Sequence, residues 1–193
     1  VLGISFALIW SSAFTSARIS MFDAPPFLLL SLRFFLSGAI AIGIALFLGQ
    51  SFKFTRLEWQ AIFIFGLCQN TIYLGLNFVA MQWIDASLAA TIASLLPLVV
   101  TICLWVFFKE KLSLLGIFGL FFGLIGLMLI IKSSSPTKLN VIGIILCLLG
   151  VLALATATII VRNSTEKNLL MMIGLQMLVG SITLLPLSLF FEV

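Results

Sequence analysis

Long apolar runs alternate with short polar breaks along the whole chain. Each run has about 20 residues, the length that a helix needs to cross a hydrocarbon core about 30 Å thick. The runs are continuous and lack a period of two, which favours helices over the strands of a barrel. The pattern predicts seven membrane-spanning helices, at 1–21, 27–49, 59–81, 86–108, 114–131, 141–161 and 169–191.

The composition agrees with a chain embedded in a lipid bilayer. Of the 193 residues, 63% are hydrophobic and 8% are charged, whereas about a quarter of the residues in a soluble domain are charged. The formal net charge is +4, but the basic residues are spread thinly and form no patch with interleaved aromatic residues. We therefore expect no nucleic-acid partner.

The apolar runs contain no histidine and no carboxylate, which limits the chemistry they can perform. The chain has no histidine, and its three cysteines, Cys68, Cys103 and Cys147, are widely spaced within apolar runs. This arrangement indicates neither a disulfide framework nor a metal site. Intramembrane hydrolases need an inward Ser/His pair, an Asp pair or a metal. We therefore expect no enzyme, no cofactor and no metal. A retinal protein is also excluded, because the last run has no lysine.

Basic residues in the breaks predict the orientation of the chain. With a cytoplasmic N-terminus, six lysines and arginines lie in inner breaks and two in outer breaks, and cytoplasmic loops are the ones enriched in these residues. We expect that orientation, in a bacterial inner (plasma) membrane. The inner residues are Lys53, Arg56, Lys109, Lys111, Arg162 and Lys167, and the outer ones are Lys132 and Lys138.

Polar residues inside the apolar runs point to function, because each must find a partner or face water. They form stripes on two adjacent predicted helices, at helical spacing, and these stripes predict a polar cavity between the two helices. The alternative is hydrogen bonding within or between helices. The stripes are Asn70, Tyr73 and Asn77, with Gln69 beside them, and Ser87, Thr91, Ser94 and Thr101.

Two further features concern helix shape and packing. Pro97 lies near the middle of the fourth predicted helix, where it bends the helix and frees a carbonyl beside the expected cavity, unless it is simply tolerated there. The fifth predicted helix has no polar side chain and carries a stripe of glycines. This stripe predicts close packing against another helix of the chain or against a second copy. Its members are Gly116, Gly119, Gly123 and Gly126.

Two arginines lie inside apolar runs. Arg18 is about three residues from the end of its helix, so its guanidinium can reach the headgroups easily. Arg33 is about 9 Å deep, at 1.5 Å per residue. It either snorkels to the interface or faces a cavity, where it attracts an anion or pairs with Asp23 or Asp85 in the outer breaks. We include both arginines in the predicted substrate pathway, with Arg18 ranked lower.

Several segments resemble an EamA-type repeat of the drug/metabolite transporter superfamily. The segments "LRF" around Arg33, "SLLPL" around Pro97 and the acidic Glu110 in "FKEKLS" match that pattern in order and spacing. The resemblance covers residues 1–131 and implies a secondary transporter of small metabolites or drugs. It also implies a central cavity lined by the first four helices of each repeat, with the fifth at the periphery.

Family members of this kind have ten helices in two inverted five-helix repeats. The segment "GLQMLVGSIT" resembles "SLRFFLSGAI" at an offset of 143, which places Gln176 opposite Arg33 and in the predicted pathway. We expect an all-α polytopic membrane protein with a first repeat at 1–131, a linker at 132–140 and the start of a second repeat at 141–193. The chain then carries seven of ten expected helices and is interpreted as a truncated fragment.

The predicted function is a permease or exporter working by alternating access, with the substrate pathway formed by Arg18, Arg33, Asn70, Tyr73, Asn77, Thr91, Ser94, Pro97 and Gln176. A structural or assembly subunit that transports nothing is the alternative. The expected partners are the lipid bilayer and a small-molecule substrate. The residues leave open the substrate, the direction of transport, a coupling ion and homo-oligomerisation.

Overall fold

The computed structural model describes residues 2–110, 114–133, 140–162 and 168–192. All of its regular elements are helices. They are α1 (Leu2–Ser20), α2 (Pro26–Phe47), α3 (Arg56–Phe65), η1 (Gly66–Tyr73), α4 (Leu74–Ala80), α5 (Ala86–Ala93), α6 (Leu96–Phe108), α7 (Leu114–Ser133), α8 (Val141–Val161) and α9 (Leu169–Phe191).

These helices confirm the predicted apolar runs. The elements α3, η1 and α4 form one continuous span, Arg56–Ala80, and α5 and α6 form another, Ala86–Phe108. Among the described residues, five helices are long and apolar enough to cross a membrane, and Leu114–Gly126 is a shorter apolar helix. The fold is therefore that of an all-helical polytopic membrane protein. Much of the predicted linker at 132–140 lies outside the described residues.

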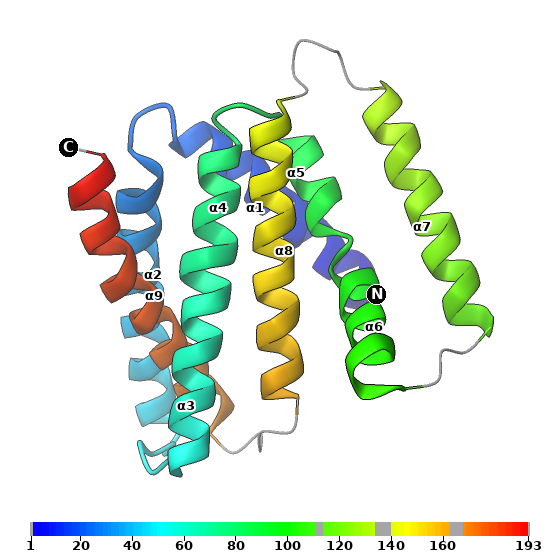
Figure 1. Cartoon of the computed structure of the whole chain (residues 1–193). Coiled ribbons are helices and arrows are strands. Elements are labelled where there is room, and N and C mark those ends of the chain that lie inside the picture. Colours follow the sequence, from blue (N-terminus) through cyan, green and yellow to red (C-terminus); the bar gives the residue numbers. More distant parts are fainter. Residues whose placement is uncertain (1, 111–113, 134–139, 163–167, 193) are drawn as a thin grey trace.

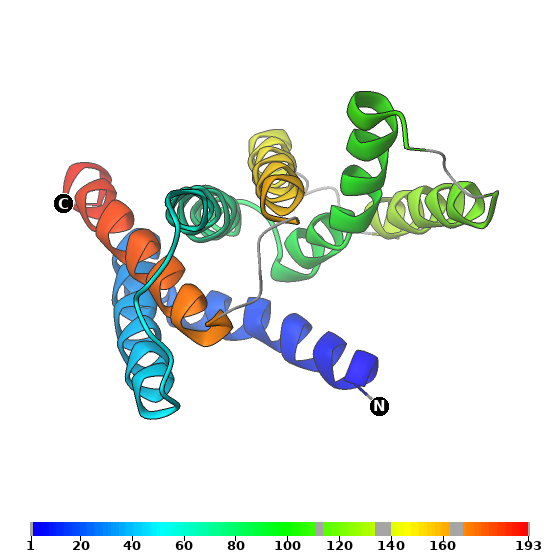
Figure 2. The same ribbon diagram turned by 90° about the horizontal axis from the view of Figure 1, so that it is seen from below.

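Most helices run up and down, and α2 and α9 cross at the edge of the molecule opposite α7 (Figure 1). These two helices cross in both views and run in opposite directions, and no other pair of elements is packed more extensively. The helix α1 runs obliquely to the rest (Figure 2). The helix α7 lies at the far edge of the molecule, as expected for a peripheral fifth helix.

Side chains at the ends of α2 and α9 tie the two helices together. The carboxylate of Glu192, just after α9, accepts hydrogen bonds from the backbone N–H groups of Phe27 (2.6 Å) and Leu28 (3.0 Å) in the first turn of α2. At the other end, the side-chain oxygen of Gln50 accepts from the N–H of Met171 in the first turn of α9 (2.9 Å). Each acceptor satisfies an N–H that lacks a partner within its own helix. The negative charge of Glu192 also favours the positive end of α2.

The fourth span is broken where the sequence predicted a bend. The helix α5 ends at Ala93, and α6 begins at Leu96, with Pro97 in its first turn. Proline lacks an N–H and its ring clashes with the preceding turn, so it is best tolerated at a helix start. The chain therefore begins a new helix at this point instead of bending a continuous one.

Close packing through glycine occurs at different places from those predicted. On α7, a Cβ added to Gly119 or Gly126 would meet no atom within 4 Å, and one on Gly123 would lie 3.0 Å from Leu98 Cδ1. The predicted seam within the chain is therefore wrong for Gly119 and Gly126. The tight glycines instead lie where other spans cross α9 and α8. They are Gly38, Gly66, Gly143, Gly150, Gly174 and Gly180.

The contacts between α2 and α9 are reciprocal. A Cβ on Gly38 would lie 2.9 Å from the carbonyl oxygen of Gly174, and one on Gly174 would lie 3.1 Å from the carbonyl oxygen of Gly38. Two turns away, Ser31 Oγ donates to the carbonyl oxygen of Ser181 (3.0 Å). Under the sequence offset of 143, Ser31 corresponds to Gly174 and Gly38 to Ser181. The crossing therefore has the internal symmetry that a two-fold axis between α2 and α9 produces.

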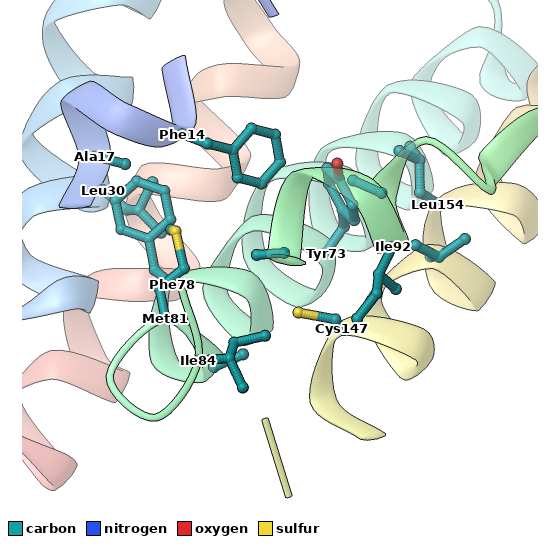
Figure 3. Close-up of a cluster of buried hydrophobic side chains, with 14 of the residues drawn as sticks. Phe14, Ala17, Leu30, Tyr73, Phe78, Met81, Ile84, Ile92, Cys147 and Leu154 are labelled. Atoms are coloured by element: carbon teal, nitrogen blue, oxygen red, sulfur yellow. The ribbon is translucent and has the colours of Figure 1, made fainter. Parts of the chain in front are cut away.

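The buried core lies between the third span and its neighbours. It draws side chains from α1, α2, η1, α4, α5, α8 and α9, and α7 contributes none among the described residues. Figure 3 shows Phe14 of α1 and Tyr73 of η1 in this cluster, with Cys147 and Leu154 of α8 on the other side of the third span. The third span is thus the element around which the others are arranged.

Candidate functional site

A cavity of about 270 Å³ opens between α1, α2, the third span and α9. Its size is near the lower end of the range for small-molecule sites. Most of its wall is apolar and aromatic, with a few polar side chains from α2 and η1. The lining residues are Ile9, Ala13, Phe14, Arg33, Phe34, Gln69, Asn70, Tyr73, Leu74, Phe78 and Met177.

Arg33 is the charged residue of this lining. It is the eighth residue of α2, which places its Cα about 10 Å from the helix start at 1.5 Å per residue. Its side chain is exposed to the cavity and its surroundings, and among the described residues it makes neither an ion pair nor a hydrogen bond. The predicted pairing of Arg33 with Asp23 or Asp85 is therefore not present in this structure.

The polar residues of the third span reach the cavity from a π-helix. The element η1 holds Gln69, Asn70 and Tyr73, all three of which line the cavity. A π-helical turn widens the backbone spiral, and such insertions are frequent at functional sites. The wider turn changes which side chains share a face. The stripe predicted at α-helical spacing is therefore only partly correct in this segment.

Asn70 and Tyr73 are both buried and have different partners. The Nδ2 of Asn70 donates to the backbone carbonyl oxygen of Gln176 in α9 (2.8 Å), which fixes the amide across the helix crossing. Tyr73 is only 2% exposed, and its hydroxyl is buried without a hydrogen-bond partner. A buried hydroxyl without a partner costs free energy, and this one belongs to a residue of the cavity wall.

Asn77 lies between the lining residues Leu74 and Phe78 in the chain, but it packs against α8. Its Nδ2 donates to the carbonyl oxygen of Tyr73 (2.7 Å), and its Oδ1 is buried without a partner. A Cβ on Gly150 of α8 would lie 3.1 Å from Nδ2, so the glycine makes room for the amide. Asn77 is therefore placed at a helix contact, outside the lining of the cavity.

The polar residues of the fourth span bond to their own helix. Thr91 Oγ1 donates to the carbonyl oxygen of Ser87 (2.7 Å), Ser94 Oγ to that of Thr91 (2.6 Å) and Thr101 Oγ1 to that of Pro97 (2.7 Å). This is the alternative that the sequence left open. The lining of the cavity described above includes no residue of the fourth span. A pathway role for Thr91, Ser94 and Pro97 remains a prediction.

Arg18 and Gln176 also lie outside the lining. The guanidinium of Arg18 donates to the carbonyl oxygen of Met81 and lies over the ring of Phe22, 5.9 Å from its centroid. Arg18 thus joins α1 to the end of α4, where carbonyl groups lack helical partners. Gln176 is 9% exposed and contributes its backbone carbonyl to Asn70.

Sequence reasoning missed the apolar walls of the cavity. Phe14, Phe34, Phe78 and Met177 resemble any other membrane-facing residue in the sequence, because lipid and an apolar cavity favour the same side chains. One signal was available: Phe34 follows Arg33, and the offset of 143 places Met177 opposite Phe34. Among the described residues, no group of three or more His, Cys, Asp or Glu side chains is placed to hold a metal.

The fold agrees with that of a solved crystal structure. The TM-score is 0.68 at 20% sequence identity, over 95% of this chain and 64% of the other. At this identity the likeness concerns the fold alone.

Curated relatives are named as transporters. The chain is 22% identical over 180 residues to the uncharacterized transporter YvbV of Bacillus subtilis, covering 92% of this chain and 58% of the relative. It is 28% identical over 179 residues to an uncharacterized transporter of Archaeoglobus fulgidus, covering 92% and 62%. It is also 28% identical over 119 residues to an S-adenosylmethionine/S-adenosylhomocysteine transporter of Chlamydia muridarum, covering 62% and 37%.

The first two of these relatives extend beyond the matched region, since the chain spans about three fifths of their length. The model of the EamA-like transporter family matches residues 1–132, which is more than half of the chain. The match confirms the resemblance carried by Arg33, Pro97 and Glu110. The chain belongs to the EamA-like transporter family.

Proposed function

We propose that the protein is a secondary transporter of small metabolites that works by alternating access. The observation that carries this proposal is the cavity between α1, α2, the third span and α9, which combines Arg33 and buried polar groups within membrane-spanning helices. Polar groups at this depth are costly unless they serve a pathway or a structural pair. The membership of the EamA-like transporter family supports the same conclusion.

The proposal includes two inverted repeats, the first at 1–131 and the second starting at 141. The reciprocal Gly38–Gly174 contacts support it. So do the caps at the two helix starts: Glu192 caps Leu28 of α2 and Gln50 caps Met171 of α9, and Leu28 and Met171 correspond under the offset of 143. An odd number of helices per repeat turns the second copy upside down in the membrane.

Two irregular segments provide places where the helices can change shape. The π-helix η1 replaces regular α-helical bonds in the third span, and the break before Pro97 divides the fourth. Interrupted helices near the middle of the membrane are common in transporters, because their freed backbone groups can line a substrate or ion site. We place the motion of the proposed transport cycle at these two segments.

The N-terminus is proposed to be cytoplasmic, with the protein in the inner (plasma) membrane. This follows from the excess of lysine and arginine in the breaks on one side. Lys109 and Arg162 lie just after the ends of α6 and α8, and the 2.7 Å pair between Arg162 and Glu110 brings these two ends together, which supports the proposal.

The substrate of the Chlamydia relative does not carry over directly. S-adenosylmethionine carries a sulfonium cation, and a site for it needs a negative or strongly accepting group. The described lining of the cavity offers Arg33 and no carboxylate. We therefore limit the proposal to a small-molecule substrate.

The test is a flux screen on the full-length protein in proteoliposomes, with radiolabelled metabolites that differ in charge and size. Alternating access predicts saturable uptake and faster uptake when the lumen is preloaded with the same compound. Flux that rises linearly with concentration would indicate a channel. Lack of flux for every class would favour the alternative, a membrane subunit that transports nothing.

A further inference from the structure

The cavity holds a positive charge that nothing in the described protein balances. The five side-chain carboxylates of the described residues lie at helix ends or in turns and outside the lining: Asp23, Glu58, Asp85, Glu110 and Glu192. Arg33 makes no ion pair or hydrogen bond with a described residue. A guanidinium stays protonated in proteins, so the cavity is permanently cationic.

A second group at the same cavity is also unsatisfied. The hydroxyl of Tyr73 is buried, has no partner and belongs to a residue of the lining. The Nδ2 of the neighbouring Asn70 is already used by the carbonyl oxygen of Gln176. The available donors are therefore the guanidinium, this hydroxyl and the side-chain amide of Gln69, which also lines the cavity. All three suit a carboxylate, which accepts a charge-assisted pair from arginine and further bonds from a hydroxyl or an amide N–H.

The rest of the wall suits a flat apolar body. Phe14, Phe34 and Phe78 come from three different elements, and Leu74 and Met177 complete the apolar side. Figure 3 shows Phe14 and Tyr73 approaching the same cluster from α1 and the third span. The volume of about 270 Å³ equals roughly nine times the 30 Å³ that a water molecule occupies in the liquid. A ligand on the order of ten non-hydrogen atoms therefore fits.

We propose that the substrate bound here is a small aromatic monocarboxylate that carries no positive charge, an inference that rests on the proposed transport function. An ammonium group on the ligand would enter a cavity that already holds Arg33 and would find no described carboxylate to accept it. Zwitterions and cations are therefore disfavoured by unpaired charge. A neutral amide of the same shape loses the pairing with Arg33.

The experiment uses four compounds with the same phenyl ring and chain length. They are 3-phenylpropionate, 3-phenylpropanamide, 3-phenylpropylamine and phenylalanine, which differ in charge. Binding to the full-length protein in nanodiscs is measured by the shift in melting temperature and by titration calorimetry. We expect 3-phenylpropionate to bind at least about tenfold more tightly than the other three, the fold-change that one charge-assisted hydrogen bond typically confers.

Three variants test the role of Arg33. Arg33→Gln is expected to weaken 3-phenylpropionate binding at least about tenfold, and Arg33→Lys less, because lysine keeps the charge but lacks the planar fork. Arg18→Gln is the matched control and should bind as the unmodified protein does, since Arg18 bonds to Met81 outside the cavity. Size-exclusion elution profiles in detergent verify that each variant is folded. If Arg33→Gln does not fold, Arg33→Lys still tests the role of the guanidinium.

The outcomes separate this inference from the proposed function. Equal binding of the amine or of phenylalanine, no binding of 3-phenylpropionate, or binding unchanged in Arg33→Gln overturns the inference. Proteoliposome flux is measured in parallel. Selective binding without flux would leave the inference standing and refute transport, whereas flux of cations with no dependence on Arg33 would refute the inference and leave transport standing.

Discussion

Two arginines of similar sequence context have different surroundings in the structure. Arg18 and Arg33 both lie within apolar helices, and the sequence ranked them by depth alone. Arg18 is held by the carbonyl oxygen of Met81 and by Phe22, whereas Arg33 lines the cavity without a described partner. A charge with a partner stabilises the fold, and a charge without one costs free energy that a ligand can offset.

This difference predicts opposite effects of the same substitution. Arg33→Gln should leave expression and membrane insertion near normal and strongly reduce transport by the full-length protein. Glutamine is expected to fit, because Gln176 occupies the corresponding place in α9. Arg18→Gln should retain most transport and lower the melting temperature, because it loses the bond to Met81. Flux per inserted protein and thermal unfolding measure the two effects, and equal flux losses in both variants would contradict the assignment.

At the scale of the element, the position of a glycine matters more than its repetition. The stripe on α7 has the spacing of a packing seam, but Gly119 faces open space. Gly66 stands alone in η1 and allows the backbone of α9 to approach: a Cβ there would lie 2.7 Å from the carbonyl oxygen of Gln176. A backbone carbonyl cannot rotate away as a flexible side chain can, so this contact tolerates no larger residue.

We therefore expect Gly66→Ala to destabilise the protein by about 1–3 kcal/mol, the usual cost of overpacking. Gly119→Ala is the matched control and should be neutral or stabilising by up to about 1 kcal/mol, since alanine favours the helix. Unfolding in detergent, followed by circular dichroism, measures both. A lower stability of Gly119→Ala than of Gly66→Ala would show that α7 packs against a partner, such as a second copy of the chain.

The third span shows how much of an element the sequence could predict. Its length and its polar residues were clear from the apolar pattern. Its division into α3, η1 and α4 was not, because a π-helix differs from an α-helix by one hydrogen-bond step and is stabilised by tertiary contacts. The crossing with α9, where Asn70 bonds to Gln176, is such a contact.

At the scale of the whole molecule, the orientation in the membrane is proposed from the loop charges. The proposed orientation places the turn after α4 outside and the turn after α2 inside. Gln82 and Lys53 are exposed residues of these two turns. Ser113 and Ser134, the corresponding labelling positions in the loops on either side of the fifth predicted helix, lie outside the described residues.

Cysteine labelling checks this orientation in a background where Cys68, Cys103 and Cys147 are replaced by serine. We expect Gln82→Cys to react with a membrane-impermeant maleimide in intact cells, and Lys53→Cys to react only after permeabilisation. The reverse pattern would show that the loop charges do not set the orientation of this chain. A flux measurement on the cysteine-free background confirms that it is folded.

The sequence by itself determined the fold class, the helix positions and the family, because each depends on local pattern: apolar length, breaks and short motifs such as "LRF". The offset of 143 even predicted that residues around Arg33 and Gln176 are equivalent. Only the tertiary structure decided that the cavity lies against α1, α2 and α9 instead of the fourth span. A hydroxyl such as that of Thr91 can bond to its own helix or face a cavity, and these choices differ little in energy along an isolated helix. The packing of neighbouring helices makes the choice, through contacts such as Gly38 with Gly174 that join residues far apart in the chain.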